Sequence, residues 1–136
     1  MKNILIVGTG TIGEPLIGLL AQHKKELGID NVSFFKRTPL SDEKGKVEAL
    51  IRKGAKLVAT SEAKNDFVSM GFSVEQLEKS YEENQVIIDC TPSGNKNWDE
   101  IYSNLDKDKR YLAQGSEHGF GPFFASVSYT HLRAHE

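Results

Sequence analysis

The segment GTGTIG, at Gly8–Gly13, constrains the fold of this chain more than any other feature of its 136 residues. A short apolar run, Asn3–Val7, comes directly before it. After it, from Thr11 to about Leu27, apolar residues recur at spacings that predict an amphipathic helix closed by Gly28. A buried strand, a glycine-rich turn and a helix in this order are typical of a unit that binds the phosphates of a dinucleotide.

Each glycine of this segment has its own expected role. Gly8 permits a tight turn, Gly10 lets a pyrophosphate approach the backbone, and Gly13 lets the helix pack closely on the strand. The N–H groups of the first helical turn and the helix dipole then attract the phosphates. The alternative is a tight structural turn in an α/β protein that binds no nucleotide.

The rest of the chain alternates between strand-like and helix-like segments. Short apolar runs predict further strands at Asn31–Lys36, Lys56–Ala59, Gln85–Asp89 and Arg110–Ala113. Helical patterns lie at Asp42–Lys53, Glu62–Met70, Val74–Glu82 and Asn97–Leu105. This alternation predicts an α/β fold, a Rossmann-type doubly wound parallel sheet, with Asn3–Val7 at its centre and helices on both faces.

Composition limits the partners that we expect for the chain. The 17 basic and 19 acidic residues are well mixed and give a net charge of -2, which favours neither nucleic acid nor an anionic membrane as a partner. A single cysteine allows no intramolecular disulfide and no cysteine-rich metal site, and we expect no metal. Because no apolar stretch approaches the roughly 18 residues of a membrane span, the expected location is the cytoplasm.

The end of the second predicted strand bears on the choice of cofactor. An NAD site usually places an acidic residue there to hold the ribose 2′-hydroxyl, but no acid lies between Asp30 and Asp42. Instead, Lys36, Arg37 and Thr38 offer two cations and a hydroxyl, which suit a 2′-phosphate. The sequence therefore favours NADP over NAD, the alternative being a solvated basic strand end.

A second loop, DCTPSG at Asp89–Gly94, follows another apolar strand. Ligands of open parallel sheets bind at this edge, so the loop is a candidate part of the same site. Cys90 could be a nucleophile only with an activating base or a positive field beside it. We favour the simpler interpretation, a small and mostly buried thiol at a strand end.

Four motifs in order carry a family resemblance: GTGTIG, IRKGAKLVA, DCTPSG and AQGSEHG. Together, over residues 1–125, they resemble the N-terminal dinucleotide-binding domain of the archaeal-type (type II) glyceraldehyde-3-phosphate dehydrogenases. The resemblance implies the N-terminal domain of a longer dehydrogenase, one that oxidises a phosphorylated aldehyde with hydride transfer to NADP or NAD. It also implies a nucleophilic cysteine in a later segment, which Cys90 does not match, so that this chain alone is expected to be inactive.

The resemblance assigns cofactor-binding roles to residues of all these motifs. They are Gly8, Gly10, Thr11, Ile12 and Gly13 at the pyrophosphate, Lys36, Arg37 and Thr38 at the adenosine ribose, Thr91, Pro92, Ser93 and Gly94 beside the nicotinamide ribose, and Gln114 and Gly115 near the nicotinamide. His118 stands where the family tends to carry a lysine. It would be either a polar contact at the cofactor edge or a solvated loop histidine, and its neighbour Glu117 belongs to the same segment.

Two other classes of function stay open at this point. One is a reductase of another kind, such as a homoserine dehydrogenase-like or dihydrodipicolinate reductase-like enzyme, which needs no cysteine nucleophile. The other is a module that binds NADP without turnover. In the full-length enzyme we expect a small-molecule aldehyde substrate and possible homo-oligomers.

Residues 126–136 do not read like the rest of the chain. The run VSYTHLRAHE has no helical or strand periodicity and resembles the in-frame translation of a common sequencing-library adapter. We therefore expect two parts, a dinucleotide-binding domain at residues 1–125 and a foreign tail at residues 126–136, and we expect the tail to pack poorly.

Overall fold

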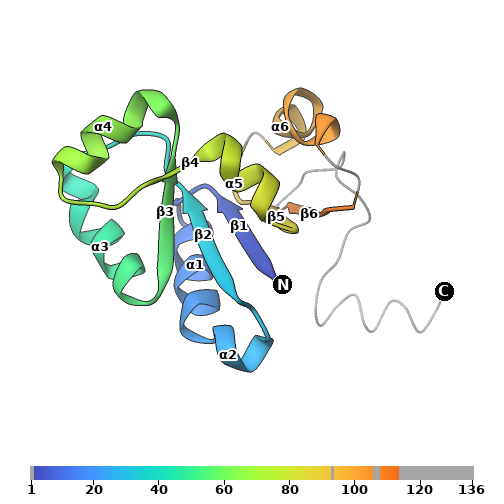
Figure 1. Cartoon of the computed structure of the whole chain (residues 1–136), viewed down its shortest axis with the longest axis horizontal. Helices are drawn as coiled ribbons and strands as arrows, with labels where there is room; N and C mark the ends of the chain where they lie inside the picture. The colour runs from blue at the N-terminus through green and yellow to red at the C-terminus, as the bar shows by residue number, and fades with distance from the viewer. Residues whose placement is uncertain (1, 93, 106–107, 114–136) are drawn as a thin grey trace.

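The computed structural model describes residues 2–92, 94–105 and 108–113. Within them, six strands form one parallel sheet in the order β4-β3-β2-β1-β5-β6 (Figure 1). The strands are β1 (Asn3–Val7), β2 (Asn31–Phe35), β3 (Ala55–Ala59), β4 (Glu75–Gln76), β5 (Val86–Asp89) and β6 (Arg110–Ala113). The predicted α/β fold with a doubly wound parallel sheet is confirmed.

The order of the strands determines where a ligand site can form. The chain runs outward from β1 through β2 and β3 to β4, then returns to the other side of β1 to form β5 and β6. The last residue of β1, Val7, is in register with Phe35 of β2 and with Asp89 of β5. The order in which the chain adds strands therefore reverses between β1 and β5. In folds of this kind, a crevice opens at the carboxyl ends of the strands at that point.

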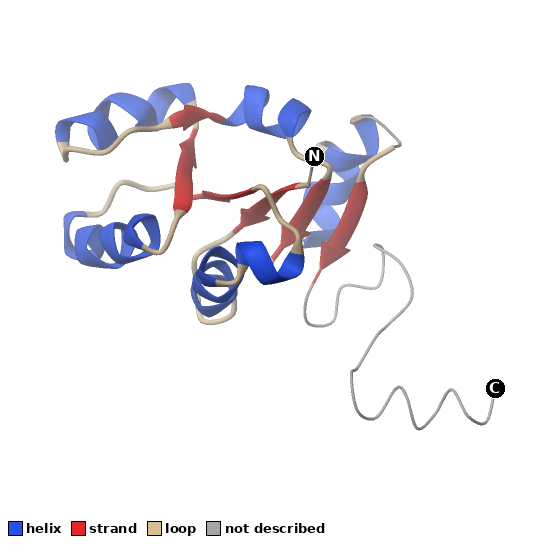
Figure 2. Ribbon diagram, turned by 60° about the horizontal axis from the view of Figure 1, so that its bottom comes forward, coloured by secondary structure: helices blue, strands red, loops and turns tan. Residues whose placement is uncertain are grey.

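Helices cover both faces of the sheet (Figure 2). The helices are α1 (Gly13–Gln22), α2 (Lys24–Leu27), α3 (Lys44–Arg52), α4 (Ser61–Ser69), α5 (Leu77–Glu83) and α6 (Gly94–Glu100), with 3-10 turns η1 (Ser41–Glu43) and η2 (Tyr102–Asn104). Thr60 caps α4, because its side chain accepts a hydrogen bond from the N–H of Ala63 at 3.3 Å.

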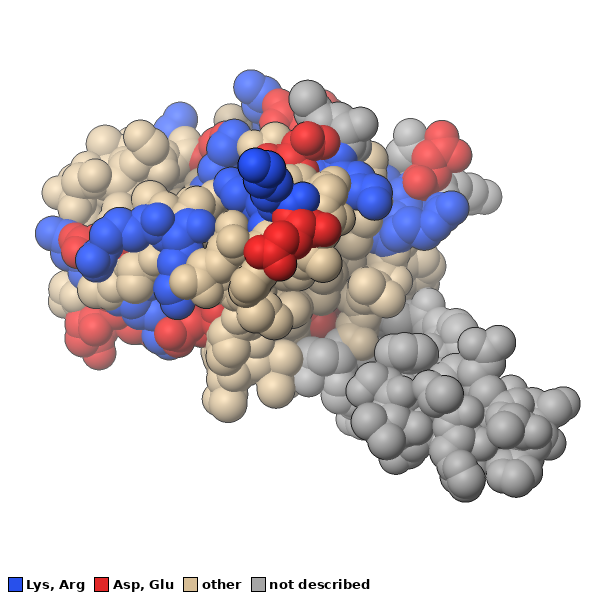
Figure 3. Space-filling view, turned by 90° about the horizontal axis from the view of Figure 1, so that it is seen from below, with Lys and Arg blue, Asp and Glu red and all other residues tan. Residues whose placement is uncertain are grey.

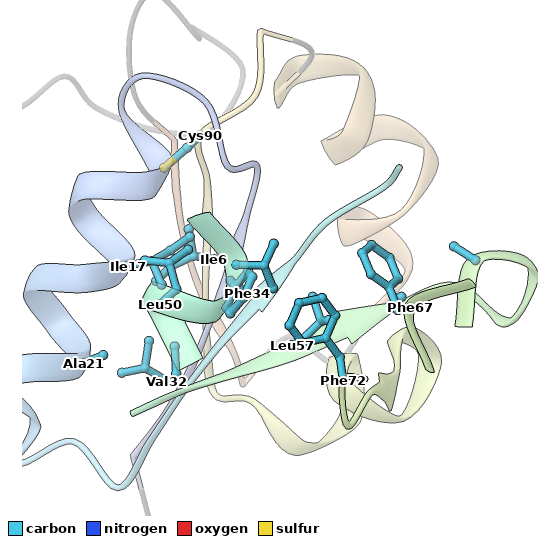
Figure 4. Packing of buried hydrophobic residues seen from close by; sticks show 14 residues of the cluster. Ile6, Ile17, Ala21, Val32, Phe34, Leu50, Leu57, Phe67, Phe72 and Cys90 are labelled. Carbon is cyan, nitrogen blue, oxygen red and sulfur yellow. The ribbon is translucent and has the colours of Figure 1, made fainter. Parts of the chain in front are cut away.

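Successive residues of each strand pack into two different apolar clusters, as the two-residue repeat of a strand requires. Ile6 packs with Ile17 of α1 and Phe34 of β2 in the cluster drawn in Figure 4. Leu5 and Val7 pack on the other side, in a cluster that includes residues of α5 and η2. A fully buried side chain of this size contributes about 1.5–3 kcal/mol, so both layers stabilise the central strand.

The predicted helix from Thr11 to Leu27 is wrong in its extent. The first helix starts at Gly13 and ends at Gln22, and His23 leaves the helical conformation with φ -111° and ψ 21°. A separate turn, α2, follows and ends at Gly28, whose φ of 70° is the left-handed conformation that a glycine adopts at little cost. Gly28 does close the helical region, but that region is broken at His23.

Two other predicted helices also differ from the structure. The segment predicted as Val74–Glu82 begins with the two-residue edge strand β4, which pairs with Val58 and Ala59, and α5 starts only at Leu77. The helix predicted at Asn97–Leu105 starts earlier, at Gly94, and gives way to η2 after Ile101. The change at η2 follows from Tyr102, because this side chain is buried and bonded to Asp89.

The surface carries charges of both signs. On the face shown in Figure 3, Lys and Arg side chains are interspersed with Asp and Glu side chains. Among the described residues, no helix has both the length and the apolar character needed to cross a membrane.

Candidate functional site

Three loops meet at the carboxyl edge of the sheet, where β1, β2 and β5 end. The N–H of Gly8 donates to Phe35 O at 3.4 Å, and the N–H of Cys90 donates to Val7 O at 2.8 Å. The N–H of Lys36 likewise donates to Val58 O at 3.2 Å. These bonds continue the ladder beyond the strands and hold the glycine turn, the basic strand end and the DCTPSG loop side by side.

A cavity of about 530 Å³ lies between these loops. Ligand pockets of proteins commonly measure about 300–1,000 Å³, so this cavity has the size of a small-molecule site. Six residues predicted from the sequence line it, namely Gly8, Lys36, Arg37, Thr38, Thr91 and Pro92. The fold thus brings the predicted ribose segment and part of the predicted nicotinamide-ribose loop around one space.

An apolar wall of the cavity was missed by the sequence analysis. Leu77 and Tyr81 of α5 line it, together with Ile101 and Tyr102, which lie beyond α6. Leu77 and Tyr81 are four residues apart and therefore share one face of their helix. That spacing was visible in the sequence, but the segment as a whole is polar, and nothing local shows that its apolar face turns toward the carboxyl edge.

The three glycines of the turn differ in what surrounds them. Gly8 has a φ of +106°, and a Cβ there would lie 3.1 Å from Thr91 Cγ2. A Cβ on Gly13 would lie 2.0 Å from the carbonyl oxygen of Gly8, which is a severe clash. A Cβ on Gly10 would meet nothing within 4 Å. Packing and backbone conformation therefore require the first and last glycines but not the middle one.

Several predicted site residues lie elsewhere. Of the described residues, Gly10, Thr11, Ile12 and Gly13 are not among those that line the cavity; the first three are exposed and Gly13 is buried. Gly94 begins α6. Ser93, Gln114, Gly115, Glu117 and His118 lie outside the described residues, as does the tail at residues 126–136.

The basic strand end is only partly exposed. Arg37 and Thr38 are exposed, but Lys36 is only 6% exposed. Its Nζ donates to the Oε2 of Glu43 in η1, which forms an ion pair at the cavity wall. This hydrogen bond, with the nearby charges of Lys36 and Lys46, lowers the pKa of Glu43 even though burial acts in the opposite direction. Lys36 is therefore not a solvated cation, and its charge is already balanced.

A buried carboxylate organises the DCTPSG loop. Asp89 is fully buried, and its Oδ1 accepts from the N–H of Thr91 at 2.8 Å and from the Thr91 hydroxyl at 2.6 Å. Its Oδ2 accepts from Asn97 Nδ2 at 2.8 Å and from the Tyr102 hydroxyl at 2.6 Å. These lengths are typical of bonds to an ionised carboxylate. Asp89 thereby fixes the loop, α6 and η2 around one wall of the cavity, a role that the sequence analysis did not assign.

Cys90 is poorly suited to act as a nucleophile. The residue is 8% exposed, which confirms the expected buried thiol at a strand end. Burial, and secondarily the charge of Asp89, raises the pKa of the thiol to about 11. Since only the thiolate attacks, this side chain is almost wholly unreactive near neutral pH.

Comparisons with known proteins leave the family of this chain open. No family model matches the sequence, and a search of curated proteins finds no relative.

Proposed function

We propose that this chain binds a dinucleotide of the NAD(P) type and serves as the cofactor-binding domain of an oxidoreductase. The open space at Gly10 is the observation that supports this proposal most. Gly10 lies in a turn whose other two glycines are explained by the protein's own packing, whereas its missing side chain leaves open space above the backbone. Room for a ligand's phosphates at the first turn of α1 supplies a reason for glycine at this position.

The surroundings of the turn suit such a ligand. The cavity beside it combines an apolar wall, suited to a base or ring, with polar and cationic groups at the end of β2. Arg37 and Thr38 are exposed there and can bind a ribose phosphate or hydroxyl. NADP is the cofactor that these groups favour, as the sequence predicts.

The likeness to glyceraldehyde-3-phosphate dehydrogenases suggests the reaction of the whole enzyme. That reaction would oxidise a phosphorylated aldehyde, and the bound cofactor would supply the hydride acceptor. The described residues would contribute binding and orientation: the glycine turn at the phosphates, the end of β2 at the ribose, and the Asp89-anchored loop along the cavity. Buried Cys90 would take no part as nucleophile, in agreement with the position of the family's cysteine in a later segment.

Calorimetric titration with NADP and NAD tests the proposal. The chain should bind NADP, and Gly10→Ala should weaken binding at least tenfold, because the new methyl group stands where the phosphates approach. Its thermal midpoint should stay near that of the unmodified chain, since a Cβ at this position meets no protein atom within 4 Å.

Gly45→Ala is the matched control. Gly45 lies in α3 and also has nothing within 4 Å of an added Cβ, but it does not line the cavity. This variant should bind as the unmodified chain does and gain slightly in stability, by about 1 kcal/mol, because alanine is the better helix former. If neither nucleotide binds the unmodified chain, or if both glycine variants bind equally well, the proposed function is wrong.

A further inference from the structure

The ion pair at the end of β2 places a negative charge where the proposed cofactor would carry a phosphate. Lys36 lines the cavity, yet its ammonium group is held by Glu43 rather than directed freely toward the space. The Lys36 side chain is only 6% exposed, whereas the Glu43 side chain is 28% exposed. A ligand phosphate that binds Lys36 must therefore compete with the Glu43 carboxylate.

Glu43 can also form an ion pair with a second cation, Lys46. Its Oε1 lies 3.6 Å from Lys46 Nζ, and Lys46 lies 3.1 Å from Glu14 Oε2 in the first turn of α1. Lys46 also donates to the carbonyl oxygen of Thr9 in the glycine turn, at 3.5 Å. The positive charges in this cluster, on two lysines, thus equal the negative charges, on two glutamates. Glu43 can release Lys36 and remain paired with Lys46, so the exchange leaves no carboxylate alone.

We propose that Glu43 sets the selectivity of the site between NADP and NAD by competing with the 2′-phosphate for Lys36. This inference rests on the proposed function. A phosphomonoester carries about 1.5 to 2 negative charges near neutral pH, so its approach to Lys36 is opposed by the Glu43 carboxylate until that carboxylate withdraws. The two hydroxyls of the NAD ribose bring no such charge and need no displacement. Glu43 thus restrains a preference for NADP that Lys36 and Arg37 would otherwise make larger.

Glu43→Gln removes the competing charge and keeps the shape of the side chain. Lys36 then faces an amide oxygen, a weaker acceptor than a carboxylate, and gains more from an arriving phosphate. We expect NADP to bind about tenfold more tightly, the equivalent of one charge-assisted hydrogen bond, while the dissociation constant of NAD stays unchanged.

Glu48→Gln is the matched control, because it changes the net charge of the chain equally and lies on α3 close in sequence to Glu43. Glu48 instead pairs at the surface with Lys44, at 4.0 Å, and both side chains are about half exposed. Its NADP and NAD affinities should match those of the unmodified chain. Adding Lys36→Met to Glu43→Gln should abolish the gain, since the cation that the phosphate acquires is then gone.

Calorimetric titration of each variant with NADP and with NAD tests the role of Glu43. If Glu43→Gln does not fold by circular dichroism, Glu43→Asp, which withdraws the carboxylate by one methylene, should give a smaller gain in NADP affinity. An unchanged NADP affinity in the folded variant overturns the inference and leaves the proposed function standing. So does weaker NAD binding, which would assign Glu43 to the ribose hydroxyls. Failure of the unmodified chain to bind either nucleotide overturns both.

Discussion

The Tyr102 hydroxyl allows a sharp test of how the cavity wall is held together. Tyr102→Phe removes one donor from the buried Asp89 carboxylate and keeps the ring. That ring stacks on Tyr111, with centroids 5.8 Å apart, and meets Tyr81 edge-on at 6.3 Å. Because the aromatic packing is retained, the loss of stability should come from the hydrogen bond alone.

Tyr102→Phe should lower the free energy of unfolding by about 2 kcal/mol, because a hydrogen bond to a charged group contributes roughly 1.5–3 kcal/mol. Among the described residues, Asn97 at 2.8 Å is then the remaining donor to Asp89 Oδ2, and full burial prevents water from replacing the missing one. Since no apolar area is lost, the free energy of unfolding should fall with urea concentration at the same slope as in the unmodified chain.

Urea unfolding followed by tryptophan fluorescence measures this loss. Trp98, the chain's one tryptophan, packs edge-on against Tyr111 at 5.2 Å and so reports on the same cluster. Tyr81→Phe is the matched control, because it removes a hydroxyl from the cluster without removing a hydrogen bond of Asp89, and it should cost under about 0.5 kcal/mol. Equal losses in the two variants would refute the argument that Asp89 depends on Tyr102.

Two further predictions concern Gly13 and Cys90. In Gly13→Ala the added Cβ, built 2.0 Å from the Gly8 carbonyl oxygen, must force α1 away from β1, at a cost of about 3 kcal/mol by urea unfolding; stability within experimental error of the unmodified chain would contradict the close approach. Cys90, with a thiol pKa of about 11, should react with iodoacetamide at pH 8 roughly a hundredfold more slowly in the native chain than in urea, and faster as the pH approaches 11. Equal rates in the folded and unfolded chain would show that the thiol is accessible and ionised.

The strands could be predicted well from the sequence because each is a short apolar run buried in a parallel sheet. Asn3–Val7 and Arg110–Ala113 match the structure at both ends. Helix boundaries were predicted less well. The apolar pattern continues past His23, but the helix breaks there, and η2 exists because Tyr102 reaches a carboxylate 13 residues earlier in the chain. Local periodicity carries no information about such a distant partner.

Only the part of the candidate site that lies at the ends of the strands could be predicted from the sequence. Residues that end parallel strands must meet at one edge, so Gly8, Lys36 and Thr91 could be brought together from sequence alone. The pairing of Lys36 with Glu43 could not, because it depends on the direction of a side chain and on the turn η1 that returns toward β2. The two cations predicted at the end of β2 therefore differ, because Lys36 is buried and paired whereas Arg37 is exposed.

Arg37 and Lys36 then have different tasks in the proposed site. Exposed Arg37 can meet a phosphate directly, whereas buried Lys36 must exchange the Glu43 carboxylate for the phosphate. An exchange between two anions changes the free energy less than the formation of a new ion pair, since the buried cation is neutralised before and after. If the proposed site binds NADP, we therefore expect Arg37 to supply most of the attraction for the phosphorylated ribose, and the Lys36–Glu43 pair to limit how much Lys36 adds to it.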